Sequence, residues 1–182
     1  MTIAGNADDS LKEMFSDLKK LLGTSSDTPA FGDEIVSRMK VTHASIDQKL
    51  EEPNKTEGKI VVELEVAEDM LNGWRSSWHL LYHAELLNGA GSVHGGCSAF
   101  LIDLCSSLSL MLIDPGLTVS QSLNIVYHSP ANLGEKLRIV NTTITVGSRI
   151  MSARVEIWNA TKHRLVASGV HIKMQPSPSS KL

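Results

Sequence analysis

An apolar run near the middle of the chain is too long for an ordinary strand and predicts one helix over residues 95–113. Leucine, isoleucine, phenylalanine and methionine occur on every side of this helix, a pattern typical of a helix enclosed by protein. Between His94 and Ile113 the only acidic or basic side chain is Asp103. An ionised carboxylate in such surroundings is costly unless something compensates it, so Asp103 is a candidate for chemistry.

Alternating apolar and polar positions on both sides of this run predict strands, separated by turns rich in glycine, proline and asparagine. A short helix is expected over residues 34–39. The expected strands cover residues 40–47, 59–67, 117–128, 135–146, 149–159 and 164–174. One long helix followed by four strands is an α+β arrangement.

Near its start the chain has the pattern of an amphipathic helix over residues 9–22, which Asp9 or Ser10 can cap and Gly23 ends. Such a helix most often packs on its own domain or on a neighbouring subunit. Membrane binding is the alternative interpretation. Residues 24–30 form a polar linker.

The glycines at the start of the long helix leave its first amides uncovered. Those amides and the helix dipole favour a negatively charged oxygen, such as the oxyanion of an attacked carbonyl. Asp103 can then activate a water or attack directly. Gly95 and Asp103 are eight residues apart, about 12 Å at the helical rise per residue, so one carbonyl cannot touch both in a single chain. The spacing indicates a site shared across a two-fold dimer.

The residues around this turn resemble those of the PaaI-type hotdog-fold acyl-CoA thioesterases. The family pattern has an asparagine, here Asn88, six residues before His94-Gly95-Gly96, and an aspartate nine residues after the histidine, here Asp103. Further matches in the same order are Val119-Ser120, the stretch Asn-Ile-Val-Tyr-His-Ser-Pro-Ala at 124–131, and Leu133-Gly134-Glu135.

The likeness runs from residue 88 to about residue 173, with a looser fit back to about residue 31. The chain departs from the pattern at Ser122, where some relatives have an acidic residue. It also has a longer segment at 69–87, which contains Trp74 and Trp78. That insertion is either an extra packed flap or a lid over the acyl pocket.

The resemblance implies a hotdog fold, in which a curved antiparallel sheet wraps around one long central helix, and homodimers that usually pair into tetramers. It implies hydrolysis of acyl-CoA thioesters to free acid and CoA without a metal or redox cofactor. The Gly95 amide would polarise the thioester carbonyl, and Asn88 and His94 would place the thioester and support the turn. Asp103 of the neighbouring subunit would be general base or nucleophile, and Ser120 would help to hold the water.

For the CoA moiety, the resemblance points to two segments. One comprises Tyr127, His128, Ser129 and Pro130, and the other is the turn Gly147-Ser148-Arg149. Arg149 either meets a phosphate of CoA or is an ordinary solvated turn charge.

Each catalytic candidate also has an alternative role. Asp103 can be a structural residue bonded to Ser106 or Ser107, three and four places further along the helix. Gly95 can serve the turn alone, and His94 can be a general base in its own right. Asn88 and Ser120 can simply satisfy backbone groups.

Cys97 lies at the helix start, where a thiolate is favoured, and can instead be the nucleophile. Cys97 and Cys105 are eight residues apart on one helix, so they cannot pair with each other. They indicate a reducing compartment, and their spacing does not predict a zinc site.

A chain of 182 residues suits one domain with additional terminal segments. Its formal net charge of −3 and the lack of a basic cluster beyond Lys19-Lys20 argue against nucleic-acid binding. No uninterrupted run of 18 apolar residues predicts a membrane span, and the first residues lack the features of a signal peptide.

The last residues, Ser180-Lys181-Leu182, match a peroxisomal import signal on a tail rich in proline and serine. We therefore expect a peroxisomal protein, cytosolic before it meets the import receptor, although a chance ending is the alternative. The expected parts are an N-terminal helix and linker (1–30), a hotdog thioesterase domain (31–174) and a flexible tail (175–182).

Two further functions remain open on the sequence. A hotdog hydratase or dehydratase would act on the same class of substrate, but it usually has an aspartate–histidine dyad in a different local motif. A non-catalytic acyl-CoA-binding domain would keep the fold, but it would not need a lone carboxylate on an apolar helix.

Overall fold

The computed structural model describes residues 2–23, 30–72 and 91–176. Asn88, most of the 69–87 insertion and Ser180-Lys181-Leu182 therefore lie outside the described residues. The helices are α1 (Asp9–Ser16), α2 (Leu18–Leu22), α3 (Asp33–Arg38), the single-turn η1 (Glu68–Met70) and α4 (Gly95–Met111).

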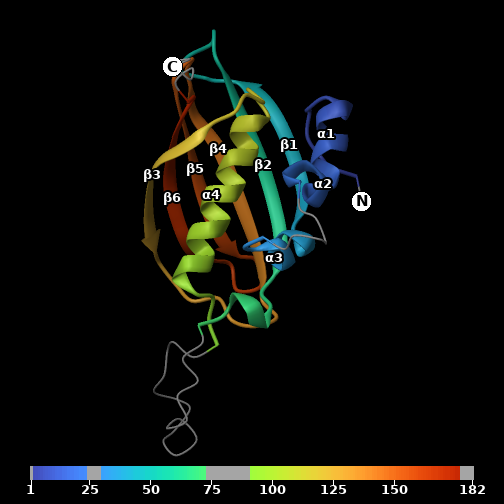
Figure 1. The fold of residues 1–182 in the computed structure, drawn as a ribbon, viewed down its shortest axis with the longest axis vertical. Coiled ribbons are helices and arrows are strands. Elements are labelled where there is room, and N and C mark those ends of the chain that lie inside the picture. Colours follow the sequence, from blue (N-terminus) through green and yellow to red (C-terminus); the bar gives the residue numbers. More distant parts are fainter. Residues whose placement is uncertain (1, 24–29, 73–90, 177–182) are drawn as a thin grey trace, which may run out of the picture.

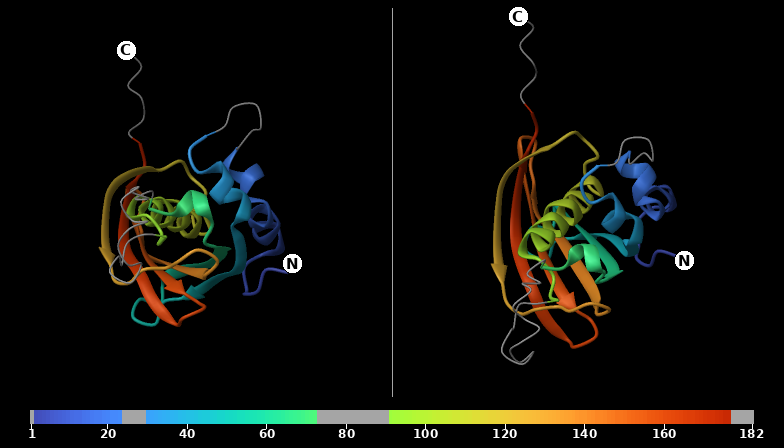
Figure 2. Two further views of the ribbon diagram at one scale, coloured as in Figure 1. Left: turned by 90° about the horizontal axis from the view of Figure 1, so that it is seen from below. Right: turned by 60° about the horizontal axis from the view of Figure 1, so that its bottom comes forward.

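The strands form one antiparallel sheet in the order β1-β2-β4-β5-β6-β3. They are β1 (Lys40–Gln48), β2 (Thr56–Glu65), β3 (Val119–Tyr127), β4 (Lys136–Val146), β5 (Ile150–Asn159) and β6 (Arg164–Met174). Figures 1 and 2 show that the sheet curves around α4. The hotdog fold expected from the sequence is thereby confirmed, with the strands within a few residues of their predicted bounds.

Inward-facing positions of the central strands form the floor on which α4 lies. On β5 the alternate residues from Met151 to Ile157 are fully buried, and Leu101 and Leu108 of α4 are buried against the sheet. The helix approaches β6 closely at Gly169, where an added Cβ would lie 3.1 Å from Ile102. A side chain at position 169 would push the helix away from the strand.

The N-terminal helix differs from its prediction because it is broken into α1 and α2 at Asp17. The Asp17 backbone leaves the helical region (φ −130°, ψ 88°), and its carboxylate accepts the N–H of Lys20 at 3.0 Å. A short acidic side chain competes for backbone donors in this way and starts a new helix. Phe15 and Leu18 are both buried in the common apolar core, so the stripe packs on the chain's own domain beside β1.

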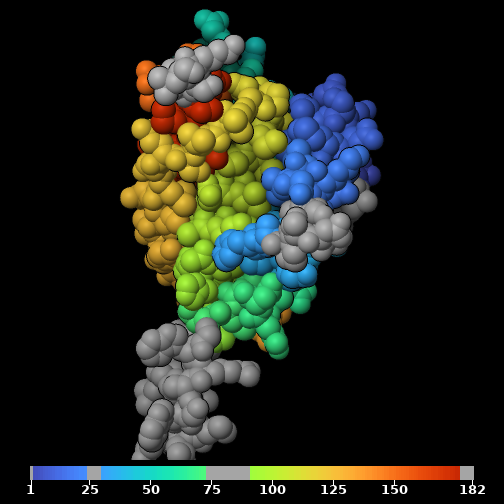
Figure 3. Space-filling view, viewed as in Figure 1, coloured from blue at the N-terminus to red at the C-terminus, as the bar shows by residue number. Residues whose placement is uncertain are grey.

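The central helix is not enclosed on all sides in the single chain, which corrects the sequence-based expectation. Figure 3 shows atoms of α4 at the surface, between β3 and α3. The Asp103 side chain is 49% exposed. The expectation failed because one sheet covers only one side of a helix, and a pattern that is apolar all round does not say what covers the other side. No helix in the described residues is long and apolar enough to cross a membrane.

Candidate active site

The segment that leads into α4 is held by backbone hydrogen bonds to two other parts of the chain, the loop after β3 and the single-turn η1. The Val93 N–H donates to the Ala131 carbonyl at 2.8 Å, and the His94 N–H donates to the Met70 carbonyl at 2.8 Å. The loop between β3 and β4, whose residues belong to the family pattern, therefore fixes the turn that leads into the helix.

His94 caps the helix through its side chain. Its Nδ1 accepts the N–H of Gly96 at 2.9 Å, so the proton of the neutral ring is on Nε2. An added Cβ at Gly96 would lie only 3.0 Å from His94 Nδ1, which explains why a glycine is needed there.

Gly95 is the first residue of α4, and its amide is uncapped. Its N–H makes no hydrogen bond with the residues that the structure describes, as is typical of a first helical turn. Its carbonyl accepts the Tyr127 hydroxyl at 3.1 Å, and an added Cβ would meet the Tyr127 ring at an ordinary 3.5 Å. The amide and the positive end of the helix dipole are therefore available to an anionic oxygen.

Asp103 lies two turns further along α4 and uses one carboxylate oxygen for its contacts. Oδ1 accepts the Ser120 hydroxyl of β3 at 3.0 Å and lies 3.2 Å from Nε2 of His171. The hydroxyls of Ser106 and Ser107 lie 3.0 and 2.8 Å from the main-chain carbonyl oxygen of Asp103, rather than against its carboxylate. The alternative in which these serines occupy the Asp103 carboxylate is therefore wrong.

Two polar residues that the sequence reasoning did not select, His171 and Lys173, face α4 from β6. His171 is fully buried, and Lys173 is nearly so. Lys173 Nζ donates to Ser107 Oγ at 3.0 Å and lies 3.4 Å from Ser120 Oγ. The sequence does contain a sign of them. Both stand at the alternate positions of the strand that face inward, where apolar residues are the rule.

Burial dominates the electrostatics of these two groups. Desolvation lowers the pKa of His171, with Asp103 acting to raise it and Lys173 to lower it further. Desolvation also lowers the pKa of Lys173, against the opposing effect of Asp103. The Asp103 carboxylate is thus in a polar cluster rather than among apolar side chains.

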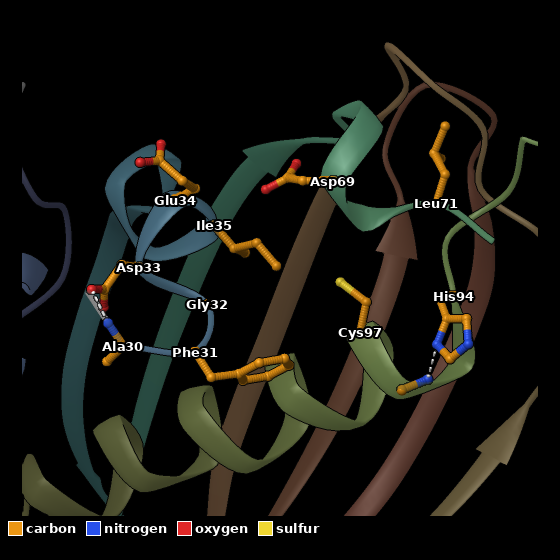
Figure 4. Close-up of a pocket in the computed structure, with 11 residues that line it drawn as sticks. Ala30, Phe31, Gly32, Asp33, Glu34, Ile35, Asp69, Leu71, His94 and Cys97 are labelled. Carbon is orange, nitrogen blue, oxygen red and sulfur yellow. Dashed lines mark hydrogen bonds between the residues drawn. The ribbon is translucent and has the colours of Figure 1, made fainter. Parts of the chain in front are cut away.

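A cavity of about 530 Å³ lies between α3 and the first turn of α4. Figure 4 shows Ile35, Cys97 and the Phe31 ring facing this space, with His94 beside it. Burial, with a smaller contribution from Asp69, raises the pKa of Cys97 to about 11. The thiol is therefore protonated at neutral pH, which argues against Cys97 as the nucleophile.

The two segments expected to bind CoA lie at opposite ends of the sheet within one chain. Tyr127 and Ile157 both pair with Ala167 of β6, so they lie at the same height in the sheet. The 147–149 turn directly precedes Ile150, at the other end of β5. Seven residues along β5 separate these levels (157 minus 150), about 23 Å at the rise of an antiparallel strand. One chain therefore does not bring the two segments together.

Each residue of the first segment has a polar contact within the chain. His128 Nε2 lies 2.9 Å from Ser168 Oγ, the Ser129 hydroxyl donates to a β6 carbonyl, and the Pro130 carbonyl accepts Arg164 at 2.6 Å. In the other segment, Ser148 and Arg149 are exposed. Among the described residues, no group of three or more His, Cys, Asp or Glu side chains is arranged to hold a metal ion.

Known proteins resemble the chain across the region that holds these residues. A sequence model of the thioesterase superfamily matches residues 90–166. Mouse acyl-coenzyme A thioesterase 13 is 38% identical over 87 residues, which are 47% of this chain and 62% of that protein. The human protein of the same name is 32% identical over 117 residues, which are 64% of this chain and 72% of that protein.

Solved structures agree. Zebrafish thioesterase superfamily member 2 has a TM-score of 0.65 at 26% identity, covering 94% of this chain and 99% of that one. The phenylacetic acid degradation protein PaaI of Thermus thermophilus, in a mutant form, shares the fold with a TM-score of 0.53 at 22% identity. That match covers 76% of this chain and 94% of that one. The chain belongs to the thioesterase superfamily, and it has the hotdog fold.

Proposed function

We propose that the chain hydrolyses acyl-CoA thioesters to a free carboxylic acid and CoA. The observation that carries this proposal is the Asp103 carboxylate, half exposed and held at one oxygen, on the same helix as the uncapped Gly95 amide. A base and an oxyanion donor are the two elements that acyl transfer to water requires. The names of the mouse and human relatives support acyl-CoA as the substrate.

In the proposed mechanism the Gly95 N–H binds the thioester oxygen as it becomes an oxyanion. The dipole of α4 adds to this effect, because the helix is unbroken from Gly95 to Met111. Asn88, which lies outside the described residues, would help to place the thioester, as the family pattern implies.

Asp103 acts as the general base. A water oxygen attacks the carbonyl carbon while one of its protons passes to Asp103 Oδ2, because Oδ1 already accepts the Ser120 hydroxyl. Collapse of the tetrahedral intermediate breaks the C–S bond and releases the CoA thiolate. The Nε2–H of His94 can donate a hydrogen bond to that thiolate, because its Nδ1 is engaged with Gly96.

The site is proposed to form between two chains. Gly95 and Asp103 are separated by about 12 Å of helix, and the two CoA-binding segments lie at opposite ends of the sheet. Within the described residues, strand β3, which carries Ser120, is paired on one side only, and Val119 and Val126 are exposed on it. An edge strand of this length with exposed apolar residues normally needs a cover. A homodimer that places the partner's Asp103 opposite Gly95 meets both requirements, and family resemblance extends it to a tetramer.

The cavity beside the first turn of α4 is the proposed site of the acyl group. Its volume falls within the range of small-molecule pockets, and it adjoins the Gly96 amide next to Gly95. Asp33, Glu34 and Asp69 lie at its lining, and of these three only Asp69 has an ion-pair partner among the described residues, Arg38. The acidic lining is unsuited to the phosphates of CoA, which supports the assignment of this end to the acyl chain.

The test is release of free thiol from a panel of acyl-CoA esters, followed with a thiol reagent. Turnover of saturated esters is expected, and Asp103→Asn should lower kcat by at least about a hundredfold, since general bases contribute that much or more. Product formation only from enoyl or hydroxyacyl esters, without thiol release, would instead identify a hydratase. Binding without either reaction would identify an acyl-CoA-binding domain.

Mixed dimers test the sharing of the site. A chain with Asp103→Asn and a chain with Gly95→Pro are each expected to be nearly inactive, but a hybrid of the two has one intact site. Random pairing makes half of the dimers hybrids, so co-refolding should restore about one quarter of wild-type activity. Each variant refolded alone is the control. A mixture no more active than its components would exclude a site shared between chains.

A further inference from the structure

The Asp103 carboxylate is connected to the protein interior through His171. The fully buried His171 ring lies between β6 and α4, with Nδ1 2.6 Å from Ser106 Oγ and Nε2 3.2 Å from Asp103 Oδ1. Serine, histidine and aspartate in this order resemble a nucleophilic triad. Ser106 is fully buried under the helix, however, and cannot reach an acyl group. Ser106 and His171 therefore act on the Asp103 carboxylate and do not form a nucleophile.

The hydrogen bonds around Ser106 determine which ring nitrogen of His171 carries the proton. The Ser106 hydroxyl has a single hydrogen and two acceptors within reach, His171 Nδ1 at 2.6 Å and the Asp103 main-chain carbonyl at 3.0 Å. That carbonyl already accepts the Ser107 hydroxyl at 2.8 Å, so it does not need Ser106. Ser106 can therefore donate to Nδ1, and this arrangement leaves the proton of the neutral ring on Nε2, the nitrogen that lies 3.2 Å from Asp103 Oδ1.

The opposite tautomer would place an Nε2 lone pair against the carboxylate, which is repulsive. Burial lowers the pKa of His171, so the ring is neutral at neutral pH and its tautomer matters. The charged groups acting on it are Asp103 on α4 and Lys173 on β6, and its neighbours across the sheet, Ala153 and Leu123, are uncharged.

The contact between His171 and Asp103 is close but not yet a well-directed hydrogen bond. Nε2 is buried and makes no hydrogen bond of good geometry with any residue that the structure describes, although Oδ1 is 3.2 Å away. A buried N–H without a partner is unfavourable. A small rotation of the carboxylate satisfies it, so the imidazole biases Asp103 toward the orientation in which Oδ1 faces inward and Oδ2 faces the cleft.

We propose that His171 is a positioning residue, which orients the Asp103 carboxylate for proton abstraction, and that Ser106 selects the His171 tautomer that points Nε2–H at Asp103. This inference rests on the proposed thioesterase function. Lys173 supports the same oxygen indirectly, because its Nζ lies 3.4 Å from the hydroxyl of Ser120, which donates to Oδ1. Oδ1 is thereby held from two sides, and Oδ2 is the oxygen that receives the proton of water.

Three substitutions at position 171 separate orientation from packing. Glutamine places an amide N–H near the position of Nε2, asparagine places it near Nδ1, and leucine has no donor. We expect His171→Asn and His171→Leu to lower kcat about tenfold with little change in KM, and His171→Gln to recover most of the loss. The acidic limb of the kcat–pH profile should move to higher pH in the asparagine and leucine variants, because the carboxylate loses a donor.

Serine variants on α4 provide a matched pair in case the buried histidine variants fold poorly. Ser106→Ala is expected to lower kcat severalfold. Ser109→Ala removes an equally buried hydroxyl, whose one hydrogen bond among the described residues goes to the Ser106 carbonyl, and it should leave kcat unchanged. Urea unfolding of each variant shows whether it is folded under the assay conditions.

The result that would overturn the inference is wild-type kcat and an unmoved acidic limb in folded His171→Asn and Ser106→Ala. Equal losses in the glutamine and leucine variants would also overturn it, since packing alone would then account for the effect. Asp103→Asn is measured alongside. No thiol release by the wild-type chain would refute the proposed function itself, and full activity of Asp103→Asn would refute the role of Asp103. Inactivity of Asp103→Asn beside a fully active His171→Asn would refute only the inference about His171.

Discussion

Replacing Gly95 by proline tests the oxyanion donor by removing one hydrogen atom. Gly95 is the first residue of α4, a position where proline is well tolerated because its N–H has no partner within the helix. The residue before a proline must be extended, and His94 already has φ −65° and ψ 137°. A Cβ at position 95 makes only ordinary contact with Tyr127 at 3.5 Å. The helix should therefore form as before, without the amide hydrogen proposed to bind the oxyanion.

The expected loss follows from the strength of one oxyanion-hole donor. Removing such a donor costs about 2.7–4 kcal/mol of transition-state stabilisation, or a factor of roughly 10² to 10³ in kcat. Gly95→Ala is the matched control, because it adds the same Cβ but keeps the N–H, and it should stay within a few-fold of wild type. Steady-state thiol release from a saturated acyl-CoA gives kcat and KM for both variants, and urea unfolding reports their stability.

The comparison refutes the assignment if the proline variant, folded as stably as the alanine variant, has a similar kcat. Equal and large losses in both variants would show that any side chain at position 95 blocks the substrate, and the amide would then have no demonstrated role. Only a loss confined to proline supports the Gly95 N–H as the donor.

Three other expectations follow from the structure, and a fourth follows from the last three residues of the sequence. Because burial lowers the pKa of His171, the unfolded chain binds a proton more readily below about pH 6.5. The free energy of unfolding should therefore decline as pH falls below that value, and urea unfolding should show a smaller decline for His171→Gln. The acidic cavity lining should lower kcat/KM at least about tenfold for ω-carboxyl acyl-CoAs relative to neutral esters of equal length, since burying an unpaired carboxylate costs well over 1.4 kcal/mol. A single turnover in ¹⁸O-labelled water should leave the Asp103 peptide unlabelled; a mass shift would identify a nucleophilic carboxylate. A fluorescent protein fused ahead of the chain should enter peroxisomes and stay outside them when Leu182 is deleted.

Local pattern was enough to predict the strands and the long helix, because alternation and uninterrupted apolar runs report directly on burial. The three strands β4, β5 and β6 were predicted within a residue of their ends. The break at Asp17 was missed because a short acidic residue in a helical pattern can either face solvent or cap a new helix, and only its dihedral angles distinguish the two.

The surroundings of Asp103 could not be predicted from the helix alone. His171 and Lys173 reach it from a strand nearly seventy residues later (171 minus 103), through the register of β6 against β3 and the packing of α4 on the sheet. The alternation along the strand predicts that residues 171 and 173 face inward. It does not say which residue of the helix they face. Ser120 was identified through the family pattern, and its bond to Asp103 follows from the same register.

The half-exposed state of Asp103 is what connects the fold to the proposed chemistry. In one chain the sheet supplies donors to the inner side of the carboxylate and leaves its outer side open, while the uncapped Gly95 amide lies about 12 Å away on the same helix. A base fully enclosed in an apolar core would have no route to water, and a base on an ordinary surface would have no fixed orientation. The unpaired edge of β3 lies beside the open side, because β3 carries Ser120. In the proposed dimer, a second copy that covers this edge near Ser120 would lie beside Asp103, so that assembly and completion of the site would be one event.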